Sequence, residues 1–179
     1  MIDKLVRLYK LDKEQTKNAE LIILECINFG CSKNQTSYIL ATAYHECKFR
    51  CIEEIGKGRN KPYGKKLKYQ KIKGIHVSYI KPNKLYYGRG FVQLTWFELY
   101  ESFGKLLNID LLNNPELALI PENASKILVY GMMRGLFTGA KLPKYVNSKS
   151  VDYINARRVV NILDKASLIK DYADKIDLL

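Results

Sequence analysis

Hydrophobic residues recur at helical spacing in the first part of the chain. Over residues 13–30, Leu21, Leu24 and Ile27 repeat every three residues, which is the spacing of one face of an amphipathic helix. Gly30 follows, and glycine is the residue that most readily takes the left-handed conformation at a helix end. The pattern therefore predicts a helix over residues 13–30.

The next helix has a marked start. Ser32 and Gln35 have the spacing of a capping box, in which each side chain bonds a free backbone amide of the first turn. We expect this helix to end near His45–Glu46. Further helices are predicted over residues 96–107, 121–137, 150–162 and 165–178.

The middle of the chain has a different pattern. Ile75, Val77 and Tyr79 alternate with small or polar residues, as in a strand. Residues 55–97 contain no acidic residue but many lysines and arginines. The segment predicts a small basic β-hairpin or ribbon between helical lobes, and residues 91–94 predict one further short strand.

Together these patterns predict a mainly α fold with two helical lobes, a β-hairpin and a central cleft. We expect one catalytic domain over residues 1–179. Residues 1–55 would hold the N-terminal helices, residues 56–95 the basic ribbon and the motif strand, and residues 96–179 the C-terminal helices. This length is enough to bury a core without disulfides or a metal.

The charge of the chain points to a polyanionic partner. It has 30 Lys and Arg against 18 Asp and Glu, a formal net charge of +12, which favours nucleic acid, an acidic membrane surface or an anionic cell-wall polymer. No apolar run approaches the ~20 residues of a membrane span. No cleavable secretion signal is recognisable, so a cytoplasmic location is expected.

The four cysteines do not suggest a metal site. Cys26, Cys31, Cys47 and Cys51 have spacings that fit no common zinc or iron–sulfur pattern. Buried free thiols are the simpler interpretation. We therefore predict no metal and no redox centre.

Two carboxylates lie where helices meet the basic segment. Glu46 is expected near a helix C-terminus, whose negative dipole end favours the protonated carboxyl. Glu54 is followed by Lys57 and Arg59, which favour the ionised form. A protonated and an ionised carboxyl together suit glycoside hydrolysis, although two solvated surface glutamates would give the same pattern.

A second motif runs from residue 86 to residue 96, with the sequence YYGRGFVQLTW. Its Gly-Arg-Gly matches neither a P-loop nor a dinucleotide fingerprint. Thr95 and Glu98 have capping-box spacing, so Thr95 is expected either to cap the following helix or to take part in chemistry.

The segment YYGRGFVQLT resembles the motif shared by glycoside hydrolase family 19 chitinases and related phage endolysins. HECKF resembles the His-Glu segment that carries the acid of that family, and NIDLLNNPELAL and INARRVVN are also similar to it. The resemblance spans residues 38–165, and the small single-domain endolysins are the most similar branch. It implies a lysozyme-like α+β fold.

The resemblance also implies roles for single residues. Glu46 matches the general acid and Glu54 the general base, with the adjacent Glu53 as an alternative. Thr95 matches the hydroxyl that positions the attacking water. The matches that would bind substrate are Gln93, Asn161 and Tyr87.

Two residues depart from the family pattern. Leu99 stands where the family usually has a substrate-contacting Asn, and Ile162 stands where it usually has Gly. HECKF also lacks the family's Gly-Gly. These differences bear on substrate preference more than on the carboxylate pair.

The implied function is inverting hydrolysis of β-1,4 amino-sugar linkages in bacterial peptidoglycan, without metal or organic cofactor. A chitinase is the first alternative. A non-catalytic basic protein that binds cell wall or nucleic acid is the second, since Tyr63, Tyr69 and Tyr79 interleave with lysines. For the enzyme we expect a monomer that binds anionic wall polymers rather than nucleic acid. It would be stored in the cytoplasm until lysis and encoded by a phage or prophage.

Overall fold

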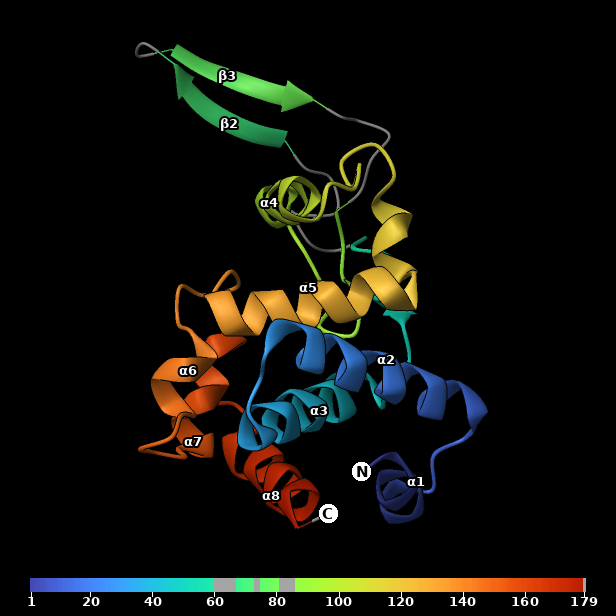
Figure 1. Ribbon diagram of the computed structural model, residues 1–179. Coiled ribbons are helices and arrows are strands. Elements are labelled where there is room, and N and C mark those ends of the chain that lie inside the picture. The colour runs from blue at the N-terminus through green and yellow to red at the C-terminus, as the bar shows by residue number, and fades with distance from the viewer. Residues whose placement is uncertain (60–66, 73–74, 81–85, 179) are drawn as a thin grey trace.

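The computed structural model describes residues 1–59, 67–72, 75–80 and 86–178. Within these ranges the fold is mainly helical, as predicted (Figure 1). Its α-helices are α1 (Ile2–Tyr9), α2 (Lys13–Phe29), α3 (Lys33–Cys47), α4 (Phe97–Leu107), α5 (Pro121–Arg134), α6 (Leu142–Tyr145), α7 (Tyr153–Ala156) and α8 (Ala166–Asp177). Two 3₁₀ turns, η2 (Pro115–Leu119) and η3 (Arg157–Val159), complete the helical part.

The ends of α2 and α3 are fixed by local hydrogen bonds. Gly30 caps α2 with φ of 80°. At the start of α3, the Gln35 amide donates to Ser32 Oγ at 3.3 Å, and the Ser32 amide donates to Gln35 Oε1 at 2.9 Å. The predicted capping box is confirmed.

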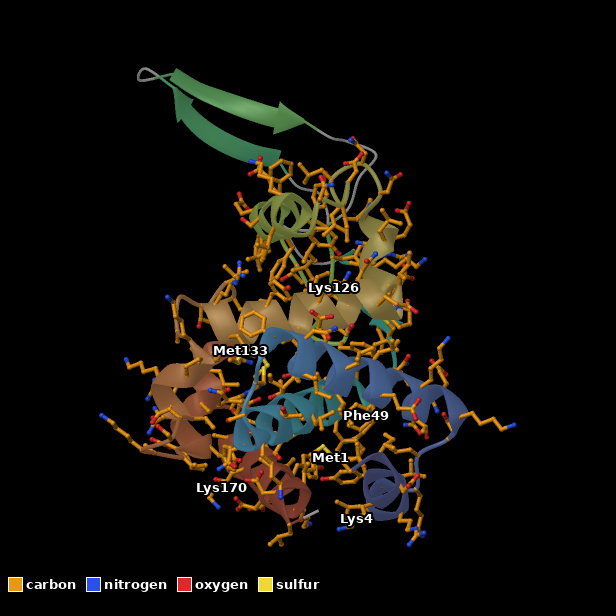
Figure 2. All side chains as sticks on the ribbon, in the orientation of Figure 1. Met1, Lys4, Phe49, Lys126, Met133 and Lys170 are labelled. Atoms are coloured by element: carbon orange, nitrogen blue, oxygen red, sulfur yellow. The ribbon has the colours of Figure 1, made fainter. Side chains whose placement is uncertain are left out.

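Helix packing builds the core around α5. α2 packs along α5 and α3 packs along α8, and in Figure 1 α4 lies on the opposite side of α5 from α2 and α3. Phe49 is fully buried, and Figure 2 shows it among the helices of the lower part of the view. Burial of such large apolar side chains is the main stabilising contribution to a fold of this size.

Helix α1 is attached to the rest of the molecule by tyrosines. The rings of Tyr9 and Tyr44 stack with centroids 3.9 Å apart, and the ring of Tyr172 meets Tyr9 edge-on at 5.9 Å. The Tyr9 hydroxyl donates to the Tyr172 carbonyl at 3.4 Å. This tyrosine stack joins α1 to α3 and α8.

A β-hairpin forms in the basic segment. Strands β2 (Leu67–Ile72) and β3 (Ile75–Ile80) pair antiparallel, with Leu67 opposite Ile80 and Ile72 opposite Ile75. The strand expected from Ile75 to Tyr79 is confirmed. In Figure 1 the hairpin lies at the end of the molecule that carries α4, far from α8. The side chains of Tyr63, Tyr69 and Tyr79 lie outside the described residues.

A second sheet joins two distant parts of the sequence. Strands β1 (Ile52–Glu53) and β4 (Arg89–Gly90) pair antiparallel, with Ile52 opposite Gly90 and Glu53 opposite Arg89. This short sheet brings Glu53 and Glu54, the two candidates for the base, beside the YYGRGFVQLTW motif.

The strand predicted over residues 91–94 is wrong. Residues 91–93 form a turn, and Leu94 bonds back to Arg89, its amide donating to the Arg89 carbonyl at 2.8 Å. Gly90, Gln93 and Trp96 have φ of 81°, 53° and 72°. Three left-handed or otherwise positive-φ residues in seven reverse the chain, which an extended strand cannot do.

Three helix boundaries also differ from the prediction. The N-cap of α4 is Trp96, which makes no side-chain capping bond, so the Thr95–Glu98 capping box is wrong. Gly135 ends α5 with φ of 74°, ahead of the predicted boundary near Phe137. The helix expected over residues 150–162 is divided into α7 and η3.

The four cysteines are free thiols, and Cys26 and Cys47 are buried, as expected. The described residues contain no group of three His, Cys, Asp or Glu side chains that could hold a metal ion. Among the same residues, we find no helix with the length and apolarity that crossing a membrane requires.

Candidate active site

Glu46 lies in the last turn of α3 and is held by a buried arginine. Arg157 NH1 contacts Glu46 Oε1 at 2.7 Å, and the side chains are 3% and 22% exposed, respectively. Arg157 Nε also donates to the Asp164 carbonyl at 3.0 Å. The contact with Glu46 is thus made by Arg157 and not by the adjacent Arg158.

The end of α3 lies against the turn of residues 89–94. Cys47 Sγ donates to the Phe91 carbonyl at 3.5 Å. Lys48 and Phe49, which follow, are both left-handed, with φ of 53° and 60°. The Asn18 amide group donates to the Phe49 carbonyl at 2.7 Å, which holds this costly backbone conformation in place. Glu46 and the turn are therefore fixed close together.

Glu53, on β1, is surrounded by donors. The Tyr87 hydroxyl donates to Glu53 Oε1 at 3.0 Å, Lys57 Nζ lies 3.1 Å from Oε2, and Arg89 Nε lies 3.9 Å from Oε1. Partial burial raises the pKa of Glu53, but the hydrogen bonds from Lys57 and Tyr87 outweigh it and leave that pKa below its ordinary value. Glu53 is thus kept ionised.

Glu54 is bound to the start of the motif by its backbone and its side chain. Its amide donates to the Gly88 carbonyl at 2.8 Å, and its Oε2 accepts from the Gly88 amide at 3.1 Å. A Cβ at position 88 would lie 2.6 Å from Gln93 Oε1. A side chain at position 88 would therefore force Gln93 to shift.

Gln93 and Thr95 line the same pocket. It has a volume of about 220 Å³, and its other walls include Trp96, Leu99, Phe137 and Val160. The Gln93 amide group donates to the Ile52 carbonyl at 3.0 Å, which ties the pocket to β1. Leu99, where the resemblance would place Asn, therefore lies in the wall beside Thr95.

Asn161 lines a neighbouring pocket of about 290 Å³, together with Thr138, Arg158, Val160 and Ile162. Val160 belongs to both pockets, so the two adjoin. Of the predicted site residues, Gln93 and Thr95 thus line one pocket, and Asn161 lines a second pocket that shares Val160 with it.

Tyr87 supports Glu53 rather than standing open to solvent. Its side chain is buried, and the Arg89 guanidinium lies 3.6 Å from the centre of its ring. In the sequence, Arg89 is distinguished only by its place in Gly-Arg-Gly. The pairing of β1 with β4 places Arg89 opposite Glu53. The two residues are distant in sequence, so no pattern of neighbouring residues predicts this pairing.

The comparisons with known proteins point to chitinases. A segment of 36 residues is 56% identical to the inactive chitinase-like protein 1 of Hevea brasiliensis, and 36 residues are 53% identical to endochitinase 1 of Theobroma cacao. Each match spans 20% of this chain, and 12% and 11% of the respective relatives. No family model matches the chain.

The whole fold is similar to a solved structure, chitinase C from Streptomyces griseus HUT6037. The TM-score is 0.69 at 18% sequence identity, over 98% of this chain and 76% of the other. An identity this low establishes the fold but not the activity. The chain has the α-rich fold of that chitinase.

Proposed function

We propose that the protein is a glycoside hydrolase that cleaves β-1,4 linkages between the amino sugars of bacterial peptidoglycan, with inversion. One observation carries the proposal. Glu46, oriented by buried Arg157, lies at the end of α3 against the turn whose Gln93 and Thr95 line a pocket. An oriented carboxyl beside a polar pocket is the arrangement that proton transfer to a bound substrate requires.

In this mechanism Glu46 donates a proton to the glycosidic oxygen. Arg157 holds Oε1, and Oε2 has no hydrogen-bond partner within the described part of the chain, so it is the oxygen that faces a leaving group. The Thr95 hydroxyl positions the water that attacks the opposite face of the sugar. An inverting enzyme needs a second, ionised carboxylate to take the proton of that water.

Glu53 and Glu54 are the two candidates for this base. The sequence resemblance favours Glu54, whose carboxylate is bound to the Gly88 amide. The electrostatics favour Glu53, because Lys57 and Tyr87 hold it in the ionised form. We keep Glu54 as the first candidate, and separate substitution of each glutamate distinguishes them.

Two features support peptidoglycan as the substrate: the net charge of the chain and the side chain of Leu99. A formal charge of +12 suits a polymer embedded in an anionic cell wall. Leu99 removes from the pocket the polar side chain that the resemblance would place there. Chitin is the second candidate, because the similar proteins are named chitinases. The name of the Hevea relative includes "inactive", so a protein that binds wall polymer without cleaving it is the third.

The first experiment compares the wild type with Glu46→Gln in turbidity clearing of permeabilised bacteria. Loss of the general acid is expected to slow clearing by about 10²- to 10⁴-fold. Glu20→Gln is the matched control, because Glu20 is exposed on α2 and should clear like the wild type. Equal clearing by Glu46→Gln and wild type would contradict the proposal.

The same assay assigns the base and the substrate. Of Glu53→Gln and Glu54→Gln, the variant with the larger loss identifies the residue that activates water. Chitin oligomers tested beside peptidoglycan separate the two polymers. Binding to walls by the wild type, without release of new reducing ends, would support the non-catalytic alternative.

A further inference from the structure

Arg158 follows Arg157 in η3 but has a different environment. Arg157 is buried against Glu46, whereas Arg158 is exposed and lines the 290 Å³ pocket. Arg158 Nε donates to Asn155 Oδ1 at 3.2 Å, and the Asn155 amide group donates to Asp152 Oδ2 at 2.7 Å. These hydrogen bonds connect the Arg158 side chain to Asp152 through Asn155.

The guanidinium of Arg158 has no carboxylate partner of its own. In the described ranges, no Asp or Glu forms an ion pair with it, in contrast to Arg157 and Arg50, which each pair with an acid. With Nε engaged by Asn155, the two NH₂ groups are the donors left for a ligand. A planar pair of donors of this kind matches a carboxylate in a bidentate contact.

The position of this pocket connects Arg158 to the proposed reaction. Val160 lines both this pocket and the pocket of Thr95. Val160 is thus the residue across which a longer glycan bound at Thr95 would reach Arg158. In peptidoglycan every second sugar carries a lactyl group that bears a carboxylate or an acidic peptide, whereas chitin carries neither.

We propose that Arg158 is a substrate-binding residue that recognises the carboxylate borne by the lactyl arm of peptidoglycan. Asn161 and Thr138 form the polar rest of this site. The inference rests on the proposed function for the identity of the polymer, but it concerns binding rather than catalysis. The carboxylate can belong to the lactyl group itself or to the attached peptide, and the ligands below distinguish these sources.

The only tryptophan of the chain provides the measurement. Trp96 is 41% exposed and lines the adjoining pocket, so its fluorescence reports on ligands bound there. The ligands are an alternating N-acetylglucosamine–N-acetylmuramic acid oligosaccharide, its peptide-bearing form, and an N-acetylglucosamine oligomer of the same length. Glu46→Gln serves as the parent protein so that the ligands stay intact, and calorimetry repeats each titration.

In that parent, Arg158→Gln is expected to raise the Kd for one or both muramic-acid ligands about tenfold, the effect of losing one charged contact. The Kd for the N-acetylglucosamine oligomer should stay unchanged, and Arg158→Lys should retain part of the affinity. A loss only with the peptide-bearing ligand assigns the carboxylate to the peptide. A loss only with the peptide-free muramic-acid ligand assigns it to the lactyl carboxylate, because in the other ligand that carboxyl is an amide. A loss with both ligands shows that Arg158 binds the carboxylate of the arm from either source.

Arg7→Gln is the charge-matched control, because Arg7 is exposed on α1. Equal weakening of all three ligands by Arg158→Gln, or the same weakening by Arg7→Gln, would overturn the inference, as would failure of the parent to bind either muramic-acid ligand. Selective binding through Arg158 without any hydrolysis by the wild type would instead contradict the proposed function and leave this subsite standing.

Discussion

His45, next to Glu46, determines how the site responds to mild acid. Burial lowers the pKa of His45, Glu46 opposes this shift, and the positive charges of Arg157 and Lys48 add to it. The folded protein therefore favours neutral His45 more than the unfolded chain does.

The free energy of unfolding is expected to fall as the pH drops below ~6.5, the ordinary histidine pKa. The unfolded chain takes up a proton at His45 in that range, while the folded protein resists it until the pH reaches the lower folded pKa. In His45→Asn this part of the pH dependence should be absent. Urea unfolding at about pH 7.5 and about pH 5.5 measures the difference.

Acidic groups provide an internal check on this result. The pKa values of Asp12 and Asp152 are lowered, mainly by backbone hydrogen bonds from Gln15 and Asn155 respectively. The contribution of these two carboxylates to the free energy of unfolding is lost only as the pH falls below ~4. This loss is the same in the wild type and in His45→Asn. Parallel stability curves for wild type and His45→Asn between about pH 7.5 and about pH 5.5 would contradict the assignment to His45.

Adjacent residues show where prediction of the site from sequence succeeds and where it fails. The motif pattern selects Gln93, Thr95 and Asn161, and the structure shows that each of them lines a pocket, while their roles toward substrate stay predictions. It could not separate Arg157 from Arg158, because neighbours in sequence differ only in which one the packing buries. Glu53 and Glu54 differ in the same way, since strand pairing gives each its own partners.

Among the structural elements, the turn of residues 89–94 positions most of the motif. Gly90 begins it with φ of 81°, and a Cβ there would lie 2.8 Å from the Ala118 carbonyl of η2 and 3.3 Å from Ala124 Cβ. The close packing of η2 against β4 therefore depends on a residue without a side chain.

Gly90→Ala is expected to destabilise the protein by about 2–4 kcal/mol, from left-handed strain of ~1 kcal/mol plus overpacking of ~1–3 kcal/mol. It should also lower hydrolysis, because the turn carries Gln93 to the pocket. Gly30→Ala is the control, with φ of 80° but nothing within 4 Å of the added Cβ, and should cost ~1 kcal/mol. Equal losses in the two variants, measured by chemical denaturation, would refute the packing argument.

Helices whose ends are set by neighbouring residues can be predicted from the sequence, whereas the turn at residues 91–93, which depends on distant contacts, cannot. α2 and α3 follow from periodicity, capping residues and Gly30, all of which lie within the helices or beside them. The turn at residues 91–93 looks like a strand in sequence, because Phe and Val favour strands. Its actual conformation is imposed by contacts with β1 and η2, which are distant in sequence.

For the whole molecule, the dominant property is the excess of positive charge. The chain carries 30 basic against 18 acidic residues. Electrostatic attraction between the protein and an anionic polymer is screened by salt. The screening length falls from ~10 Å at 0.1 M to ~3 Å at 1 M ionic strength. Charge therefore affects encounter with a wall more than it affects the bond-breaking step.

Clearing of bacterial walls is expected to fall several-fold when sodium chloride is raised from about 0.05 M to about 0.5 M. Hydrolysis of a short, soluble glycan without acidic substituents should change little over the same range. Both are measured as initial rates at one pH. A parallel fall of the two rates would show that salt acts on the folded enzyme and not on its attraction to the wall.

The tyrosine stack has a consequence for the two ends of the sequence. An isolated helix as short as α1, with eight residues, is not stable in water, so its order depends on the burial of Leu5 and on the rings of Tyr44 and Tyr172. Tyr44 lies two residues before Glu46. Any redesign that trims α1 or α8 thus also loosens the support beneath Glu46, the proposed proton donor, and has to replace the aromatic surface that it removes.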